Sequence, residues 1–304
     1  MRSTLFFGEG HLTVIDHAYI DEAGDIIGGS IAPSFTVTGD IEENEQVVID
    51  FSKCKKRIKE IIDDKTHGID HKLIVGDFSN ITAQTTLPNG HVRIETPKWV
   101  IEGPQNMFHV CDLESYEDYL EAYIGDFVSE HLQEELPGVI VQAMGGFKPV
   151  IMPWHHSYSM FRYTHGLKSS SSWGCQNIAH GHLSYITIEA DNYPAAAVLQ
   201  QKIAADLDNT MFVYNENLDV GNVISYTTER GNFKLSPKLR SHCETFGKLD
   251  VLKTETTIEN LVSYVANRYI AELRAVKANA IYISEGLAKG AMIEIGSLKG
   301  ESNL

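Results

Sequence analysis

The sequence predicts an α+β protein built from two similar units in tandem. Hydrophobic periodicity separates segments that alternate like strands from segments with helical spacing. Both halves of the chain then show the order strand, strand, helix, helix, strand. The chain of 304 residues is long enough for two domains, and a duplicated order of elements indicates an internal repeat. We place the boundary near residues 149–153, which gives units 1–150 and 151–304.

In the first half, runs of β-branched and aromatic residues alternate with two helical segments. We expect strands over 11–21, 34–40, 46–51 and 139–143, and helices over 53–64 and 115–136. The first helix has Ile58, Ile61 and Ile62 on one side, and the second ends at Pro137-Gly138. Residues 79–107 are polar and interrupted by Pro and Gly, which predicts an irregular insertion or an extra hairpin.

The second half repeats these signals with an insertion of its own. We expect strands over 160–165, 182–189, 222–228 and 280–285, and helices over 195–208 and 257–276. The strand at 222–228 falls in the second insertion, residues 215–245. The strand at 280–285 is expected to close the fold.

The composition restricts the classes of function. Acidic residues outnumber basic ones 41 to 25, for a formal net charge of -16, which argues against general binding to nucleic acid. No apolar run is long enough to span a membrane, and the first ten residues lack the apolar centre of a signal peptide. Four scattered cysteines do not form a disulfide framework. We therefore expect a soluble protein in the reducing cytoplasm, with Cys175 available as a thiol.

Three histidines form the strongest chemical signal. His180 and His182 stand two apart at the start of an expected strand, so their side chains point the same way. His165 lies on the preceding expected strand and can reach the same point. Three imidazoles with one open position are the ligand set of a catalytic zinc. The alternative is a group of ordinary core or surface histidines.

The histidines belong to a series of six short motifs. The motifs are Phe161-x-x-x-His165, Cys175 before His180-Gly181-His182, Val48-x-Asp50-Phe51, Asp70-His71-x-Leu73, Thr257-x-Glu259-Asn260-Leu261 and Ile283-Ser284-Glu285. Together they resemble the 6-pyruvoyl-tetrahydropterin synthase and 6-carboxytetrahydropterin synthase family. The resemblance implies tunnelling-fold units, each an antiparallel sheet with two helices on one face. It also implies that copies of the chain assemble into a barrel as a homo-oligomer.

The motifs are divided between the two halves. The first half has Asp70 and His71 but reads Ile31-Ala32-Pro33 where the resemblance expects the paired histidines, and Gln142 where it expects the last glutamate. The second half has the histidines, Cys175 and Glu285, but reads Asp208-Asn209 in place of the Asp-His pair. We interpret the halves as diverged copies with complementary losses. A contact between the units, within one chain or between chains, would restore a full set. His17 is interpreted as a relic of the metal-binding strand.

The resemblance also implies a role for each matched residue. Cys175 is expected to act as a general base whose thiolate is favoured by the metal and His71; the alternatives are an ordinary buried cysteine or a fourth metal ligand. Asp70 and His71 suit an acid–base relay, or else a histidine that stabilises a helix C-terminus.

Substrate contacts are expected at the fifth and sixth motifs, both of which lie in the second half. Glu285 can accept paired N–H bonds from the amino-pyrimidinone edge of a pterin, or it is an exposed acid at a strand end. Thr257 and Glu259 are expected as weaker pterin contacts, although Thr256-x-x-Glu259 also fits a capping box.

The function implied is that of a Zn²⁺-dependent lyase acting on 7,8-dihydroneopterin triphosphate. The expected product is 6-carboxy-5,6,7,8-tetrahydropterin, on the way to queuosine. Three alternatives remain: triphosphate elimination alone, as in 6-pyruvoyl-tetrahydropterin synthase; a GTP cyclohydrolase-like reaction; and a non-catalytic pterin- or purine-binding protein.

Overall fold

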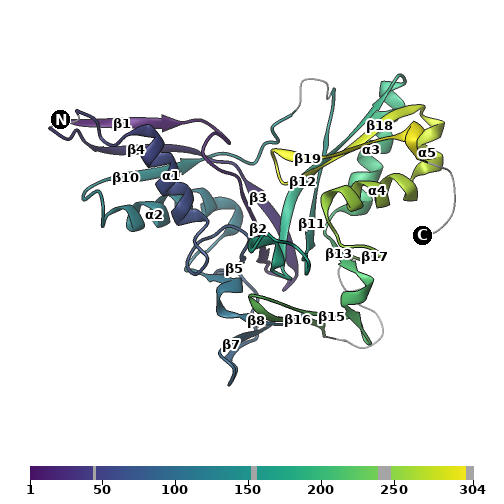
Figure 1. Cartoon of the computed structure of the whole chain (residues 1–304), viewed down its shortest axis with the longest axis horizontal. Coiled ribbons are helices and arrows are strands. Elements are labelled where there is room, and N and C mark those ends of the chain that lie inside the picture. Colours follow the sequence, from purple (N-terminus) through teal and green to yellow (C-terminus); the bar gives the residue numbers. More distant parts are fainter. Residues whose placement is uncertain (44–45, 152–155, 239–247, 299–304) are drawn as a thin grey trace.

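The computed structural model describes residues 1–43, 46–151, 156–238 and 248–298. It is a mixed α+β structure dominated by antiparallel strand pairs, with helices against one face of the sheet in each half (Figure 1). The predicted fold class is confirmed. None of the helices in the described ranges has the length and apolarity needed to cross a membrane. Part of the predicted boundary, residues 152–153, lies outside the described residues.

The first half is a long bent hairpin flanked by further strands at both ends. Its elements are β1 (Arg2–Phe7), β2 (Ile15–Ile20), β3 (Ile26–Ile31), β4 (Ser34–Asp40), α1 (Phe51–Ile62), β5 (Leu73–Val75), β9 (Phe108–Val110), α2 (Tyr116–Leu132) and β10 (Ile140–Met144). At one end β4 lies between β1 and β10 in a three-stranded antiparallel sheet. At the other end the sheet order is β3-β2-β5-β9, and β5 is parallel to both of its neighbours.

The second half has the same connections in a single sheet. Its elements are β11 (Ser159–His165), β12 (His180–Ala190), α3 (Tyr193–Leu207), β13 (Thr210–Tyr214), β17 (Lys248–Leu252), α4 (Ile258–Arg268), α5 (Ile270–Ala275), β18 (Ala278–Glu285) and β19 (Lys289–Glu294). The order is β17-β13-β11-β12-β18-β19. As in the first half, a hairpin is followed by two parallel neighbours and by a last strand antiparallel to the second hairpin strand.

The two insertions together form a further sheet. The first contributes β6 (Ala83–Thr86), β7 (His91–Glu95) and β8 (Trp99–Pro104), and the second contributes β14 (Leu218–Asp219), β15 (Val223–Thr228) and β16 (Gly231–Pro237). Antiparallel pairing of β16 with β8 joins them into one six-stranded sheet. We call it the insertion sheet; it is the part of the structure that hydrogen-bonds strands of one half to strands of the other.

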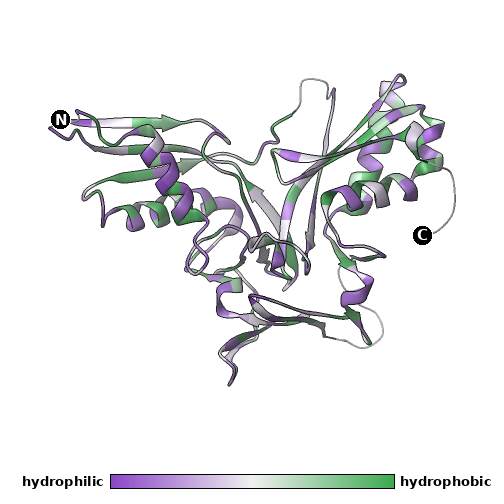
Figure 2. Ribbon diagram, viewed as in Figure 1, coloured by the Kyte–Doolittle hydropathy of each residue, from purple (hydrophilic) through white to green (hydrophobic). Residues whose placement is uncertain are grey.

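Helix α1 begins where the sequence analysis expected the end of a strand. The carboxylate of Asp50 accepts hydrogen bonds from the backbone N–H groups of Ser52 and Lys53, which caps the helix at residue 51. The predicted strand at 46–51 is therefore wrong. The outer surface of α1 is hydrophilic (Figure 2), while Ile58, Ile61 and Ile62 pack inward.

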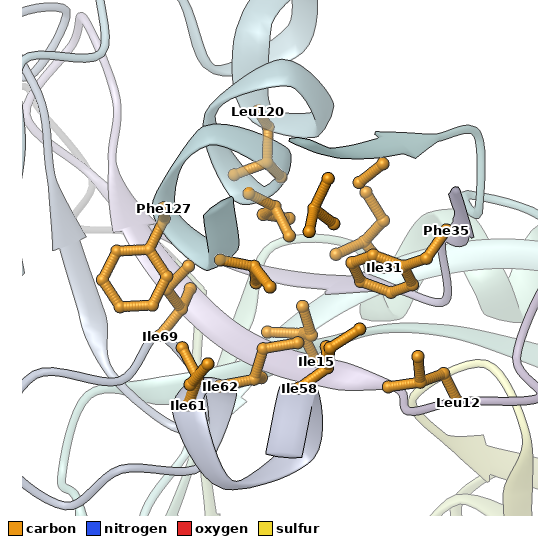
Figure 3. Packing of buried hydrophobic residues seen from close by; sticks show 14 of the residues in the cluster. Leu12, Ile15, Ile31, Phe35, Ile58, Ile61, Ile62, Ile69, Leu120 and Phe127 are labelled. Atoms are coloured by element: carbon orange, nitrogen blue, oxygen red, sulfur yellow. The ribbon is translucent and has the colours of Figure 1, made fainter. Parts of the chain in front are cut away.

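Both helices of the first half close over a single apolar core. In Figure 3 the isoleucines of α1 meet Leu120 and Phe127 of α2 over Ile15, Ile31 and Phe35 of the strands. A separate core lies between α3, α4, α5 and the second sheet. Each half thus buries its own sheet face under a layer of helices, as expected for two diverged copies.

Two details of the second half differ from the sequence analysis. The helix expected over 257–276 is divided at Tyr269 into α4 and α5. The strand at 278–285 does not close the fold, because β19 follows it and pairs with it through a tight turn at Gly286.

The two hairpins touch backbone to backbone at Gly28 and Gly181. A Cβ on Gly28 would lie 2.0 Å from the carbonyl oxygen of Tyr163, and one on Gly181 would lie 2.7 Å from the Cα of Gly28. Only glycine allows such an approach. This crossing brings β2 and β3 of the first half against β11 and β12 of the second.

Candidate active site

The three predicted metal ligands meet at the loop end of the hairpin that β11 and β12 form. His165 of β11 pairs directly with His180 of β12, and His182 lies two residues further on the same face. One ring nitrogen from each residue lies within 4.8 Å of the other two. The Nε2 atoms of His165 and His182 are 3.1 Å apart. All three side chains are buried.

Each of these imidazoles turns its Nδ1 atom toward an oxygen atom, and those of His165 and His180 are hydrogen-bonded there. Nδ1 of His165 lies 2.9 Å from the carbonyl oxygen of Thr256, and Nδ1 of His180 lies 2.8 Å from that of Asn177. Nδ1 of His182 lies 3.2 Å from a carboxylate oxygen of Asp16. With Nδ1 turned toward an oxygen, Nε2 is the nitrogen left for a ligand, which is how metal-binding histidines are commonly oriented.

The chemistry of the group fits a divalent cation. Nε2 of His180 is buried and has no hydrogen-bond partner among the described residues, which is costly unless something binds there. Burial and the neighbouring His182 lower the pKa of His165 to about 3. Burial and His165 also hold the pKa of His180 well below its usual value. Neutral imidazole is the form that binds metal ions, and a set of three histidine ligands suits zinc.

Asp16 of β2 contributes a carboxylate from the first half. Its Oδ1 atom also accepts a hydrogen bond of 2.5 Å from the hydroxyl of Ser30. Burial alone would raise the pKa of Asp16, but attraction to and hydrogen bonding with His182 bring it well below its usual range. Asp16 is therefore an anion beside an expected metal ligand.

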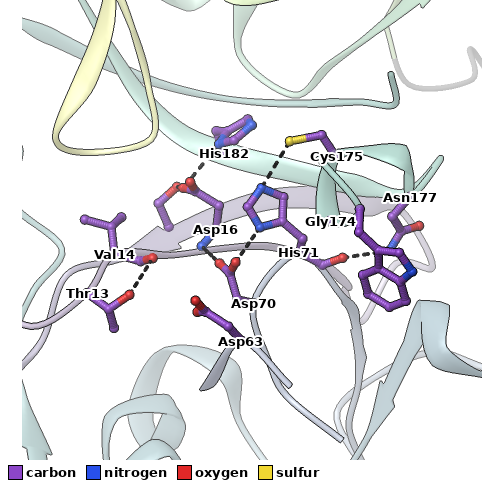
Figure 4. Close-up of polar contacts among 12 residues, drawn as sticks. Thr13, Val14, Asp16, Asp63, Asp70, His71, Gly174, Cys175, Asn177 and His182 are labelled. Carbon is purple, nitrogen blue, oxygen red and sulfur yellow. Dashed lines mark hydrogen bonds and ion pairs between the residues drawn. The ribbon is translucent and has the colours of Figure 1, made fainter. Parts of the chain in front are cut away.

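Cys175, His71 and Asp70 form a hydrogen-bonded chain across the junction of the two halves (Figure 4). The Sγ atom of Cys175 lies 3.5 Å from Nε2 of His71, and Nδ1 of His71 lies 2.6 Å from Oδ2 of Asp70. The contact is within one chain. His71 has a φ of 55°, and this left-handed turn allows adjacent side chains to face the same site.

The charges of Asp70 and His71 favour the thiolate form of Cys175. Burial opposes protonation of His71, but Asp70 and Cys175 raise the pKa of the imidazole well above its usual value. Burial raises the pKa of Cys175, yet hydrogen bonding and attraction to His71 lower it overall. A thiol beside an imidazolium is the usual arrangement of a reactive cysteine.

Close packing against glycine positions the His71 ring. Cys175 lies in a 3-10 turn, η2 (Gly174–Gln176). A Cβ on Gly174 would lie 2.7 Å from Cγ of His71, so only glycine at this position leaves room for the ring. The side-chain amide of Asn177 donates to the carbonyl oxygen of His71 at 3.0 Å and ties the two halves together here.

Cys175 also belongs to a second group with metal-binding geometry. Its sulfur and one ring nitrogen each of His71 and His180 lie within 4.8 Å of one another. The geometry therefore accommodates Cys175 both as a base and as a fourth ligand, and the two interpretations stay open.

Glu285 ends β18 close enough to the histidines for their charges to act on it. Burial raises its pKa, but His182 and Lys289 lower it overall. Its Oε2 atom lies 3.2 Å from Nζ of Lys289, and its side chain is 15% exposed. It is not the freely exposed acid of the alternative interpretation.

The remaining two expected substrate contacts do not join this cluster. Thr257 caps α4 by accepting from the backbone N–H of Asn260, so the cap falls one residue later than in the predicted capping box. Glu259 is exposed on the first turn of α4; it makes no hydrogen bond or ion pair within the described ranges. The neighbouring Thr256, which was not singled out, is the residue that contacts His165.

Asp16, Asn177 and Thr256 were missed by the sequence analysis. None stands at a ligand-like spacing from the histidines, and Asp16 lies 166 positions before His182, as their numbers show. The available signals were a buried acid in an apolar strand and a polar residue just before His180, and neither is specific.

The first half repeats the backbone geometry of the site with other residues at the histidine positions. The carboxylate of Asp70 accepts from the backbone N–H of Asp16, and that of Asp208 accepts from the backbone N–H of Arg162. His71 and Asn209, which follow the two acids, share φ values of 55° and 56°. Asp16 therefore corresponds to Arg162, and counting along the strands places Tyr19 at the position of His165.

Strand register identifies the lost histidine positions. Tyr19 pairs with Ile27, and His17 pairs with Gly29, as His165 and Tyr163 pair with His180 and His182. The segment 27–29 thus replaces the paired histidines, rather than 31–33. His17 corresponds to Tyr163 and is no relic of a ligand; its Nε2 lies 2.7 Å from the hydroxyl of Tyr116.

Comparison with known proteins adds little to this geometry. Neither a family model nor a curated protein matches the chain. Among solved structures, 6-pyruvoyl tetrahydropterin synthase of Plasmodium vivax is similar, with 16% identity and a TM-score of 0.34, over 48% of this chain and 99% of that chain. The Plasmodium falciparum enzyme has 16% identity and a TM-score of 0.31, over 45% of this chain and 93% of that chain. Likeness at this level supports no conclusion about activity.

Proposed function

We propose that this protein is a metal-dependent lyase that acts on 7,8-dihydroneopterin triphosphate and forms 6-carboxy-5,6,7,8-tetrahydropterin. The observation that carries the proposal is the chain from Cys175 through His71 to Asp70, set beside three converging imidazoles. A base next to a cation site suits removal of a proton from carbon, the step that a lyase of this kind requires.

The metal in this proposal is Zn²⁺, held by Nε2 of His165, His180 and His182. When bound, the cation would supply positive charge to oxygens of the substrate side chain and stabilise negative charge that develops there. The donor set of three imidazoles supports zinc over a hard cation such as Mg²⁺.

The chain's own groups supply the proton transfers. The Cys175 thiolate removes the carbon-bound proton, because its pKa is lowered by the adjacent His71. His71 then returns or relays a proton through Nε2. Asp70 holds Nδ1 of the ring at 2.6 Å and so fixes its orientation and stabilises its charged form.

Glu285 orients the substrate. Its carboxylate is largely buried and close to the histidines, and as an anion it can accept paired N–H bonds from the pterin edge. Lys289 balances its charge in the absence of substrate. Thr257 and Glu259 have weaker support as pterin contacts, since one caps a helix and the other is exposed.

The test is incubation of the purified, metal-replete protein with 7,8-dihydroneopterin triphosphate, followed by mass analysis of the products. The proposal expects 6-carboxy-5,6,7,8-tetrahydropterin, acetaldehyde and triphosphate. Release of triphosphate with a 6-pyruvoyl product would instead identify the nearest alternative, 6-pyruvoyl-tetrahydropterin synthase activity. Binding of the pterin without turnover would favour a non-catalytic pterin-binding protein, and formate release from GTP would favour a cyclohydrolase-like reaction.

Three further parts of the proposal concern organisation. The equal strand connections of the two halves support a division into units 1–150 and 151–304. The strands β9 and β17 have no second partner strand among the described residues, which supports assembly of copies into a homo-oligomer. Limited proteolysis near residue 150 would test the division into units, and sizing by light scattering would test the assembly into an oligomer. The third part is the setting: the proposed product lies on the way to queuosine, and we place the reaction in the cytoplasm.

A further inference from the structure

The insertion sheet contacts the turn that carries Cys175. Nη1 of Arg230 donates to the carbonyl oxygens of Trp173 and Gly174, at 3.0 and 3.2 Å. The hydroxyl of Tyr226 donates to the carbonyl oxygen of Gln176 at 3.1 Å. Arg230 lies in the turn between β15 and β16, and Tyr226 lies in β15. Neither residue has a counterpart among the six motifs.

With these bonds, every carbonyl oxygen of the turn has a donor. The remaining one, that of Cys175, accepts from the backbone N–H of Leu167 at 2.9 Å. Two of the four carbonyl oxygens from Trp173 to Gln176 are thus held by Arg230 and a third by Tyr226. A hairpin 50 to 57 positions further along the sequence thus holds the turn that carries the thiol.

Arg230 is placed as a structural cation rather than as half of an ion pair. Its side chain is buried, and its guanidinium lies 3.7 Å from the centre of the Trp173 ring. No ion pair joins it to a carboxylate in the part of the chain that the structure describes. Instead its Nη2 atom donates to the carbonyl oxygen of Asn106 at 3.1 Å. Burial lowers its pKa to about 10, so it stays charged at neutral pH.

The same contacts link the turn to the half that supplies His71. Asn106 belongs to η1 (Gln105–Met107), which follows β8. Its carbonyl oxygen also accepts from Nζ of Lys72, the residue after His71, at 2.6 Å. Arg230 and Lys72 thus share one acceptor, with the Cys175 turn on one side and His71 on the other. A guanidinium can bond three carbonyl oxygens in fixed directions, which a lysine cannot.

We propose that Arg230 is a positioning residue, which holds the turn at 173–176 so that the thiol of Cys175 stays in hydrogen-bond contact with His71. The inference deepens the proposed function, on which it rests for the role of the thiol. It assigns the insertion sheet a role in the site, beyond joining the two halves.

The test measures the reactivity of Cys175 directly and needs no pterin. The rate of iodoacetamide alkylation is followed from pH 5 to 10 by mass analysis of the peptide that contains Cys175, which excludes the other cysteines. In Arg230→Ala we expect the midpoint of this profile to rise by about one unit, which is about tenfold less thiolate at neutral pH. Greater exposure of a loosened thiol alone would raise the plateau of the profile and lower its midpoint, because burial raises the pKa of Cys175.

A double-mutant cycle separates positioning from general loosening. If Arg230 acts through the contact between Cys175 and His71, its replacement has no further effect on the midpoint in a His71→Ala background. The matched control is Arg93→Ala. Arg93 lies in β7 of the same sheet, where it pairs with Glu95 and Glu102 and is 38% exposed. The Arg93→Ala variant should leave the midpoint of the alkylation profile unchanged.

Two further variants keep the test decisive if Arg230→Ala does not fold. Tyr226→Phe removes only the hydroxyl that bonds Gln176, and Arg230→Lys keeps the charge; both are expected to raise the midpoint by less than the alanine variant. The inference is overturned if the midpoint is unchanged in all three variants, or if the shift persists when His71 is absent. Absence of lyase activity alongside the expected shifts would overturn the proposed function alone.

Discussion

The carboxylate of Asp16 lies 3.2 Å from Nδ1 of His182, although the two residues belong to different halves of the chain. Through this contact the half that has lost its own histidines orients a ligand candidate of the other half. The Nε2 side of His182 then faces His165. The first half thus contributes to the site twice. His71 contacts Cys175, and Asp16 supports the histidine ligand candidate His182 from behind.

We predict that Asp16→Asn weakens metal binding while the chain stays folded. Loss of a carboxylate behind a histidine ligand typically lowers metal affinity by about 10- to 100-fold. Competition with a chromophoric chelator would measure the change for zinc. Asp25→Asn is the control, because Asp25 pairs with Lys98 outside the cluster. Equal affinity in wild type and Asp16→Asn would contradict the orientation of His182 by Asp16.

Replacement of Cys175 separates catalysis from metal binding. We predict that Cys175→Ala lowers kcat by about 10²- to 10⁴-fold, the usual effect of removing a general base. Zinc content by elemental analysis should stay at the wild-type level, because three imidazoles remain. Loss of zinc together with activity would identify Cys175 as a fourth ligand instead. Cys111→Ala is the matched control, since this half-buried thiol contacts the carbonyl oxygen of Val75 away from the site.

The glycine crossing is predicted to be intolerant of a methyl group. In Gly28→Ala the new Cβ would lie 2.0 Å from the carbonyl oxygen of Tyr163 and 2.8 Å from the backbone nitrogen of His182. Overpacking against backbone typically costs about 1–3 kcal/mol or more in the free energy of unfolding, and here it would also displace a ligand strand. Urea unfolding would measure the loss. Gly296→Ala has open space around its Cβ and should leave the midpoint unchanged; an equally small effect of both changes would refute the close crossing.

His109 is predicted to make stability depend on pH. Its ring contacts the carbonyl oxygens of His67 and Gly68 and the hydroxyl of Tyr123, and burial lowers its pKa to about 4 from the usual 6.5. Between these values the unfolded chain binds more protons than the folded one. The contribution is therefore complete above pH 6.5 and is lost as the pH falls toward 4, by about 3 kcal/mol at most.

The measurement for His109 is the free energy of unfolding in urea at several pH values from 4 to 8. The difference between wild type and His109→Asn should shrink as the pH falls, since only the wild type carries the buried imidazole. His11→Asn is the control, because His11 is exposed. A difference that stays constant with pH would show that His109 is not held neutral.

Local patterns were enough for the elements that bury one face. The spacing of Ile58, Ile61 and Ile62 predicted α1, and the spacing of His180 and His182 predicted a shared face. The first prediction depends on residues within one helical turn, and the second depends on residues two apart along a strand. The strand predicted at residues 46–51 was wrong because a helix-capping residue was overlooked: the carboxylate of Asp50 caps α1, which begins at residue 51.

The sequence by itself determined the α+β fold class, the two similar halves and the candidate ligands, because periodicity and residue type are local properties. Only the tertiary structure decided that His71 meets Cys175 within one chain, that Asp16 supports His182, and that the two insertions form one sheet that reaches the Cys175 turn. The physical reason is that these contacts join residues 50 or more positions apart. They run from side chain to side chain at His71 and at Asp16, and through backbone carbonyl oxygens at the Cys175 turn. Carbonyl acceptors are the same in every residue, so no pattern of side chains records which of them will meet.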